Sequence, residues 1–151
     1  MTHSTKRLGV SVLAMLLACV TALFPAAGPA QAASCVSGYT ADNLPTTLQV
    51  MVHYQDCSNG TWLITSIDVY SQYTRYNATV VIRRYAEDGT VPVSWQKSLG
   101  QLGAGVFYGD VSDGKSFSYN KAYNPYVYVH YRNTTTGPYL DSPVARLPWI
   151  G

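Results

Sequence analysis

The stretch from Tyr123 to Arg132 reads Tyr-Asn-Pro-Tyr-Val-Tyr-Val-His-Tyr-Arg, and from Tyr126 onward it has the period of two that predicts a β-strand. One face of this strand suits a hydrophobic core and carries Val127, Val129 and Tyr131. The other face is aromatic with polar tips and carries Tyr126, Tyr128 and His130. That composition is typical of recognition surfaces and also of an ordinary amphipathic covering. We therefore expect Val127→Ala to lower the free energy of unfolding by roughly 1 to 3 kcal/mol. Alanine at Tyr126 or Tyr128 should instead weaken a partner interaction and leave the domain folded.

Similar short runs recur at roughly ten-residue spacing, separated by Gly, Pro, Asn and Asp turn signals. They predict strands over residues 48–54, 62–70, 78–85, 91–99, 117–119, 126–132 and 144–147. Ser58-Asn59-Gly60 predicts a hairpin turn, and three β-branched residues at 80–82 indicate a central strand. Pro92 indicates either an edge strand or the first turn of its strand. The run 62–70 is expected to place Leu63, Thr65, Ile67 and Val69 on one face and Trp62, Ile64, Ser66, Asp68 and Tyr70 on the other.

The fold class that follows is all-β, because no helical stretch of about ten residues is found after residue 32. The pattern predicts a single antiparallel β-sandwich of about six to seven short strands. The arrangement of Asp113, Phe117 and the strand from Tyr126 resembles immunoglobulin-like domains in general architecture. The Cys-Trp-Cys spacing of true members is missing, so the resemblance implies the general class alone.

The first 32 residues have the order of a secretory signal peptide. Lys6 and Arg7 precede an apolar run over residues 8–24, and Ala30-Gln31-Ala32 supplies the small residues of a cleavage site. We expect cleavage after Ala32 and a secreted, extracellular protein of bacterial type. One alternative is a lipobox ending at Cys19, which the apolar run beyond this cysteine disfavours. The other is an uncleaved membrane anchor, which the small-residue triplet disfavours.

Removal of Lys6 and Arg7 with the signal leaves eight basic residues, because the chain has ten Lys plus Arg, and these face eight Asp plus Glu. A net charge near zero lacks the basic footprint that nucleic acid or an anionic membrane requires. We therefore expect no nucleic-acid partner and no membrane association after cleavage. The remaining 119 residues (151 minus 32) are enough for one domain with a single core.

Cys35 and Cys57 are the two cysteines left after cleavage, and an oxidising compartment favours a disulfide between them. In the chain-entropy model this bridge would contribute roughly 3 kcal/mol. Residues 33–47 show no sustained period and are interpreted as an N-terminal arm pinned by Cys35, ahead of a sandwich domain over 48–151. A metal site would need more ligands near the bridge than His53 and Asp56 supply.

Groups for catalysis are few. If the strands of His53 and His130 were neighbours, the two imidazoles could meet. They could then bind a metal together with Asp56 or Asp68, or act as a general base. We favour the simpler interpretation that both histidines lie on the solvent side of their strands. Residues 110–114 could hold calcium but lack the ligand count of a recognised site, and their aspartates fit turn positions. No nucleophile-elbow, P-loop or dinucleotide motif is present. We therefore expect no enzyme activity, no cofactor and no metal.

What remains is aromatic surface, since Tyr and Trp provide large contact area at low entropic cost. The candidate binding residues are Tyr70, Tyr73, Tyr76, Tyr119, Tyr123, Tyr126, Tyr128 and His130. The alternative is that these tyrosines only cover a sandwich that is poor in charge. The function predicted is a secreted, non-catalytic protein-binding module, an adaptor subunit of an extracellular assembly or an inhibitor, which uses tyrosine-rich strand faces and the arm. The alternatives are a carbohydrate-binding module that stacks Tyr and Trp on sugars and, more distantly, a small hydrolase.

Overall fold

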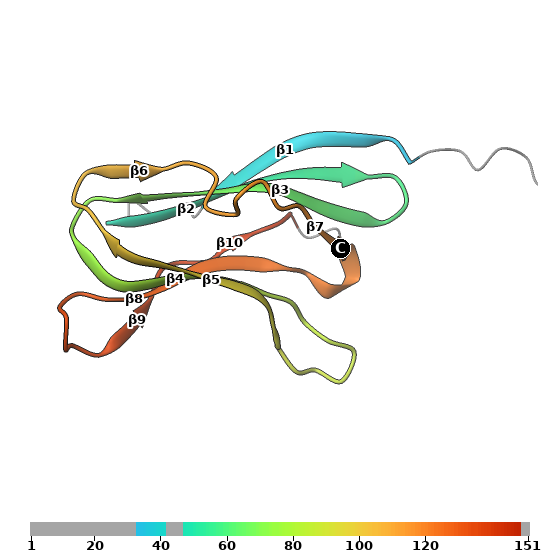
Figure 1. The fold of residues 1–151 in the computed structure, drawn as a ribbon. Helices are drawn as coiled ribbons and strands as arrows, with labels where there is room; N and C mark the ends of the chain where they lie inside the picture. Colours follow the sequence, from blue (N-terminus) through green and yellow to red (C-terminus); the bar gives the residue numbers. More distant parts are fainter. Residues whose placement is uncertain (1–32, 42–46, 149–151) are drawn as a thin grey trace, which may run out of the picture. The chain divides into compact units, whose positions relative to one another are not determined.

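The computed structural model describes residues 33–41 and 47–148, and in them the strands lie in two antiparallel sheets (Figure 1). The predicted signal peptide, with Cys19, lies outside the described residues. The helical element of the described part is one short 3₁₀ helix, η1 (Lys121–Tyr123). No helix in these residues is long and apolar enough to cross a membrane.

The first sheet has the strand order β1-β2-β3-β6, and β7 pairs with the other end of β3. Its strands are β1 (Cys35–Ala41), β2 (Leu48–Cys57), β3 (Thr61–Ser71), β6 (Val106–Tyr108) and β7 (Phe117–Asn120). The predicted hairpin at residues 58–60 joins β2 to β3. Gly60 has a φ of 80°, and the Asn59 side chain accepts a hydrogen bond from the Thr61 amide at 3.2 Å. The turn therefore forms as predicted, because Gly60 adopts the positive φ and the Asn59 side chain hydrogen-bonds the backbone.

The second sheet has the order β10-β8-β4-β5, and β9 also pairs with β8. Its strands are β4 (Arg75–Arg83), β5 (Val93–Leu102), β8 (Tyr126–Arg132), β9 (Tyr139–Asp141) and β10 (Ala145–Arg146). The central place of β4 and the edge place of β5 are both confirmed. The prediction of six to seven strands was too low, because β1, β6 and β9 were not predicted. Two of these, β6 and β9, have three residues each, which is too short to show a period.

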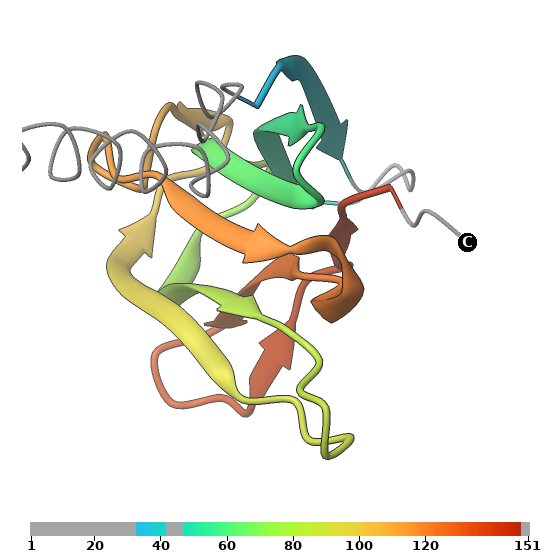
Figure 2. The ribbon, with the colours of Figure 1, turned by 90° about the vertical axis from the view of Figure 1, so that its right-hand side faces the viewer.

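One hydrophobic core lies between the sheets in a sandwich-like arrangement (Figure 2). The first sheet contributes Leu48, Val50, Val52, Trp62, Ile64, Ile67 and Val69. The second sheet contributes Ala78, Val80, Ile82, Leu102, Val127, Val129 and Ala145. Branched aliphatic side chains fill this space well because they pack against neighbours on a pleated surface. The face assignment of β8 is confirmed: Val127 and Val129 are fully buried, and Tyr131 packs against the core.

A β-bulge changes the face assignment of β3. His53 lies opposite Ser66 and Tyr54 lies opposite Ile64, so Thr65 has no residue opposite it. An extra residue shifts the alternation by one position, which moves the following side chains to the other face. The side chains of β3 in the core are Trp62, Ile64, Ile67 and Val69. The predicted single period over 62–70 was therefore wrong, since each predicted face is split between core and surface.

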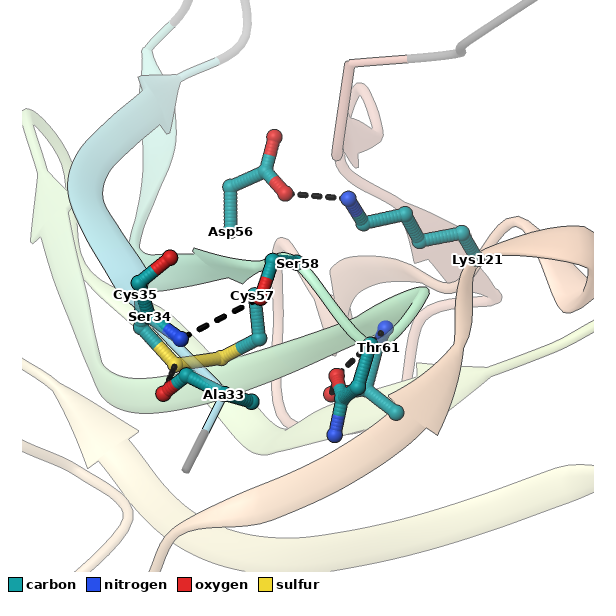
Figure 3. A network of polar contacts seen from close by, with 9 residues as sticks. Ala33, Ser34, Cys35, Asp56, Cys57, Ser58, Thr61 and Lys121 are labelled. Atoms are coloured by element: carbon teal, nitrogen blue, oxygen red, sulfur yellow. Dashed lines mark hydrogen bonds and ion pairs between the residues drawn. A yellow bond between two sulfur atoms is a disulfide. The ribbon is translucent and has the colours of Figure 1, made fainter. Parts of the chain in front are cut away.

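The predicted arm contains a regular strand. Residues 35–41 form β1 at the edge of the first sheet, in register with β2 from Cys35 opposite Cys57 to Ala41 opposite Met51. The predicted disulfide joins the first of these pairs, whose Cα atoms are 4.0 Å apart (Figure 3). Most β1 side chains are exposed, so the strand has no apolar period that would reveal it. The interpretation of residues 33–47 as an irregular arm was therefore wrong for β1.

Backbone and charged contacts strengthen the same corner of the sheet (Figure 3). The Ser58 amide donates to the Ser34 carbonyl at 2.8 Å, and the Ser34 amide donates to Ser58 Oγ at 3.2 Å. Next to them the Lys121 ammonium of η1 forms an ion pair with Asp56 of β2. The start of β1 and the end of β2 are thus held together by the disulfide and by hydrogen bonds.

Candidate binding face

The outer face of the second sheet gathers tyrosine and arginine side chains. Because Val127 and Val129 point into the core, Tyr126, Tyr128 and His130 of β8 point outward. The antiparallel register places a residue of β4 opposite each of these three side chains. On the other side Arg146 of β10 lies opposite Tyr126 and Asp141 of β9 lies opposite His130. We call this surface the tyrosine–arginine face and define it by Arg83, Tyr126, Tyr128, His130, Arg132 and Arg146.

At one end of the face Tyr126 lies between two arginines. Arg83 of β4 is opposite Tyr126, and Arg146 of β10 is opposite it on the other side. The Arg146 guanidinium lies 5.3 Å from the centre of the Tyr126 ring, within the range of a cation–π interaction. The rings of Tyr126 and Tyr128 stack at 6.1 Å and 29°. Burial raises the pKa of Tyr126 although Arg83 and Arg146 oppose the effect, so its phenol stays protonated at neutral pH.

Arg83 and Tyr128 form the centre of the face. Arg83 Nε donates to the Tyr128 hydroxyl at 3.0 Å, and Arg83 Nη1 donates to the Val91 carbonyl at 3.2 Å. Tyr128 lies outside the core cluster, as alternation with Val127 and Val129 predicts. It is nevertheless a buried residue, only 7% exposed, with Val81 of β4 opposite it. Its truncation should therefore affect stability as well as binding, which the sequence did not predict.

Two shallow hollows flank the Tyr128 ring. One, of about 230 Å³, is lined by Thr79, Val81, Arg83, Val93, Gln96, Tyr128 and His130. The other, of about 250 Å³, is lined by Arg83, Tyr126, Tyr128, Asp141 and Val144. Arg83 and Tyr128 line both hollows, so the hydrogen-bonded pair lies between them. Each hollow combines valine side chains with polar groups that can orient a ligand.

At the other end His130 is fixed by two neighbours on β9. Its Nδ1 lies 2.6 Å from Asp141 Oδ1, and its ring stacks on Tyr139 at 4.3 Å and 10°. The Arg132 guanidinium lies 4.0 Å from the centre of the Tyr139 ring. These contacts hold the short strand β9 against β8 and give this end of the face a fixed shape.

The arginines of the domain are held by tyrosines and not by carboxylates. Each arginine in the described residues lies over a tyrosine ring: Arg75, Arg83, Arg84, Arg132 and Arg146. The ion pairs within 4 Å in the same part of the chain use lysine or histidine: Lys97 with Asp113, Lys121 with Asp56, His53 with Asp68 and His130 with Asp141. No carboxylate of the described residues pairs with these guanidinium groups within 4 Å.

Tyr119 does not lie on the face. It is a buried core residue of β7, and its hydroxyl lies 2.8 Å from Ser94 Oγ. Burial raises the pKa of Tyr119, which fits a phenol that serves packing. Its inclusion among the binding residues is corrected, because β7 turns this side chain toward the core.

Tyr123 belongs to a separate corner of the domain. It lies in η1, its hydroxyl donates to Glu87 at 3.3 Å, and the Arg84 guanidinium is 4.9 Å from the centre of its ring. A hollow of about 370 Å³ opens there, lined by Arg84, Ala86, Glu87, Asp88 and Tyr123. The four candidate tyrosines between residues 119 and 128 therefore separate into a core residue, a corner residue and the pair on the face.

The cluster at residues 70–76 also separates. Tyr70 lies in β3 of the first sheet, opposite Phe107 of β6. Tyr73 follows β3, is half-exposed and has the Arg75 guanidinium 5.6 Å from its ring centre. Tyr76 lies in β4 opposite Arg132 of the second sheet. Closeness in sequence was a poor guide here, because the chain passes from one sheet to the other between β3 and β4.

The two histidines that the hydrolase alternative needs do not meet. His53 lies in β2 of the first sheet, where its Nε2 is 2.9 Å from Asp68 Oδ2, and His130 lies in β8 of the second sheet. Within the described residues no group of three His, Cys, Asp or Glu side chains could hold a metal ion. The arrangement on which that alternative depended is therefore not formed.

The carboxylates at residues 110–113 stabilise their own turn. Asp110 accepts hydrogen bonds from the Ser112 hydroxyl and from the Gly114 amide, the latter at 2.8 Å, and Asp113 pairs with Lys97. Asp110 and Asp113 have φ values of 42° and 57°, which aspartate tolerates better than most residues. These bonds lower the pKa of Asp110, with the Ser112 hydroxyl as the largest cause. The turn interpretation of this segment fits the structure.

Asp110→Asn should make stability less dependent on pH in the acid range. The folded pKa of Asp110 lies below its usual value of 3.8, so the charged carboxylate contributes stability above that value and loses it as pH falls through the folded pKa. We expect the variant to be slightly less stable than the wild type at pH 7 and the difference to shrink near pH 3, in urea denaturation. Ser112→Ala, which removes the largest cause, should behave in the same direction. A difference that is unchanged between the two pH values would contradict this.

Sequence reasoning missed the arginines of the face. Arg83 could have been found, because alternation from the buried Val80 and Ile82 places residues 79, 81 and 83 outward. The run of three apolar residues hid this period. Arg146 could not have been placed, since its position opposite Tyr126 depends on the pairing of β10 with β8.

Comparisons of the chain with protein-family models, with curated proteins and with solved structures found no match. Function is therefore inferred from the geometry of the described residues.

Proposed function

We propose that this chain is an exported, non-catalytic binding module that holds a protein partner on the tyrosine–arginine face. The observation that carries the proposal is the hydrogen-bonded pair of Arg83 and Tyr128, which lines two hollows on an outer sheet face. Tyrosine and arginine are enriched among the residues that dominate binding energy in protein interfaces. Both are held in place before binding, which lowers the entropic cost of association.

Export is supported by the signal-peptide pattern of residues 1–32 and by the disulfide, which is compatible with an oxidising compartment. Immunoglobulin-like connectivity stays a prediction, as does a use of the N-terminal segment in binding. That segment contains the edge strand β1, which pairs on one side with β2. Its other side pairs with no strand of the described residues, so its backbone groups could add a strand of a partner. The side chains of the second sheet give the stronger basis for partner choice.

Carbohydrate binding is the second candidate, and the hollow on the β4–β5 side favours it. Thr79, Gln96 and His130 surround the Tyr128 ring there. Polar groups around an aromatic ring suit a sugar, whose hydroxyls need hydrogen bonds and whose apolar face stacks. The low exposure of Tyr128 leaves little ring surface for such stacking, so we place this candidate second.

Tyr126→Ala should abolish partner capture while the domain stays folded. Tagged wild type and variant would be used as baits in the culture medium of the source organism, with capture measured by quantitative mass spectrometry. We expect capture to fall about tenfold or more, as for an aromatic residue that dominates the binding energy of an interface. Circular dichroism melts should show a smaller stability loss than for Val127→Ala, for which roughly 1 to 3 kcal/mol is expected from truncation of a fully buried side chain.

Tyr70→Ala is the matched control, since it removes a partly buried tyrosine from the first sheet. Capture that is lost with this variant and kept with Tyr126→Ala would show that the other sheet binds the partner. A glycan array with the wild type separates the two candidates. Specific retention of a glycan, lost in Tyr126→Ala, would support the second.

A further inference from the structure

The tyrosine–arginine face carries three guanidinium groups that pair with no carboxylate of the described residues. Arg83, Arg132 and Arg146 form no ion pair with the described residues, whereas Lys97 and Lys121 each pair with an aspartate. One acidic side chain, Asp141, lines a hollow of the face, and it is held by His130. The nearest acids of the β4–β5 turn are engaged locally: Glu87 accepts from Tyr123, and Asp88 accepts from Thr90.

The two arginines at the Tyr126 end flank Tyr126 from its two neighbouring strands. Arg83 and Arg146 lie opposite Tyr126 on the two neighbouring strands, which places their backbones about 10 Å apart at the usual strand spacing. Among the hydrogen bonds of the described residues, none uses Arg83 Nη2 or any nitrogen of Arg146. Free guanidinium donors on both sides of an aromatic ring are suited to a carboxylate, which accepts charge-assisted hydrogen bonds.

We infer that the partner is a protein that presents an acidic segment, with a carboxylate placed between Arg83 and Arg146 above Tyr126. This inference rests on the proposed function. From Tyr126 to Arg132, β8 extends about 20 Å, so Arg132 provides a second positive position at the far end. Between these positions Val81, Val93 and Val144 line the hollows, and aliphatic walls fit the apolar side chains of a polypeptide better than an acidic polysaccharide. Complementary charge at the ends would fix the register of the segment.

Two synthetic peptides with blocked ends test the inference: one alternates glutamate with leucine, and its twin has lysine in place of glutamate. Binding to the wild-type domain would be measured by fluorescence anisotropy at two salt concentrations. We expect the acidic peptide to bind, the basic twin to fail, and added salt to weaken binding. Arg146→Gln and Arg83→Gln should each raise the Kd about tenfold, because each removes a charge-assisted hydrogen bond.

Lys115→Gln is the control, since it removes one positive charge from the turn that precedes β7 of the other sheet; its Kd should stay within about twofold of the wild type, as for a charge away from the site. Arg83→Gln also loses the hydrogen bonds to Tyr128 and Val91, so this variant could unfold. Arg146→Gln loses no hydrogen bond within the described residues, so it tests the inference in that case. Equal binding of the two peptides, no binding of the acidic one, or no effect of Arg146→Gln would overturn the inference. Binding of polygalacturonate without binding of the acidic peptide would overturn it in favour of an acidic glycan. If a captured partner is lost with Tyr126→Ala but kept with both arginine variants, the proposed function stands and this inference fails.

Discussion

Replacing Cys35 and Cys57 together by serine is expected to lower the free energy of unfolding by about 3 kcal/mol, within a usual range of about 2 to 5 kcal/mol. The bridge joins the first residue of β1 to the last residue of β2, and it closes a loop with a sequence separation of 22. Without it the unfolded chain gains the conformational freedom of that loop. Urea denaturation of the purified double variant measures the difference, with the wild type in reducing buffer as the second measurement.

The edge position of β1 makes this bridge important for the folded state too. Most of its side chains are exposed, so β1 buries little apolar surface against the rest of the domain. Amide hydrogen exchange in the double variant should therefore show β1 losing protection before β2 and β3. The double variant itself serves as the control for reduction, since reducing agent should not change its stability. A loss below about 1 kcal/mol would mean that the backbone ladder with β2 holds β1 without the bridge.

The sequence predicts most of this fold where side-chain chemistry is local. Ser58-Asn59-Gly60 forms its hairpin because Asn59 and Gly60 supply the hydrogen bond and the positive φ that the turn needs. The strand from Tyr126 buries its valines because period two separates core from surface. The disulfide was predicted from the number of cysteines and the compartment.

Prediction fails where the structure depends on partners far along the chain. The strand β1 is exposed, so pairing with β2 and not burial defines it. The bulge at Thr65 follows from the alignment of β2 with β3, and no residue type in β3 announces it. The candidate site shows the same limit: Tyr126 and Tyr128 were found from alternation, but Arg146 comes beside Tyr126 only through the register of β10. Tyr119 was chosen by residue type, although the pairing of β7 turns it inward.

Trp62→Ala is expected to lower the free energy of unfolding by about 3 to 5 kcal/mol, which is the usual cost of truncating a buried tryptophan. Trp62 is only 2% exposed and lies in the core at the start of β3. Its ring meets the Tyr54 ring edge-on at 5.1 Å and 87°, and the Lys121 ammonium lies 4.7 Å from its centre.

Trp95→Ala is the matched control for the tryptophan change. Trp95 packs against the core from the edge strand β5, with its ring centre 4.8 Å from that of Phe117, but it remains partly exposed. Less of its surface is removed from water, so its truncation should cost clearly less than that of Trp62. Both free energies come from urea denaturation followed by far-UV circular dichroism, which does not depend on tryptophan emission. If Trp95→Ala costs as much as Trp62→Ala, the deeper burial of Trp62 does not determine the cost of its truncation, and the prediction is wrong.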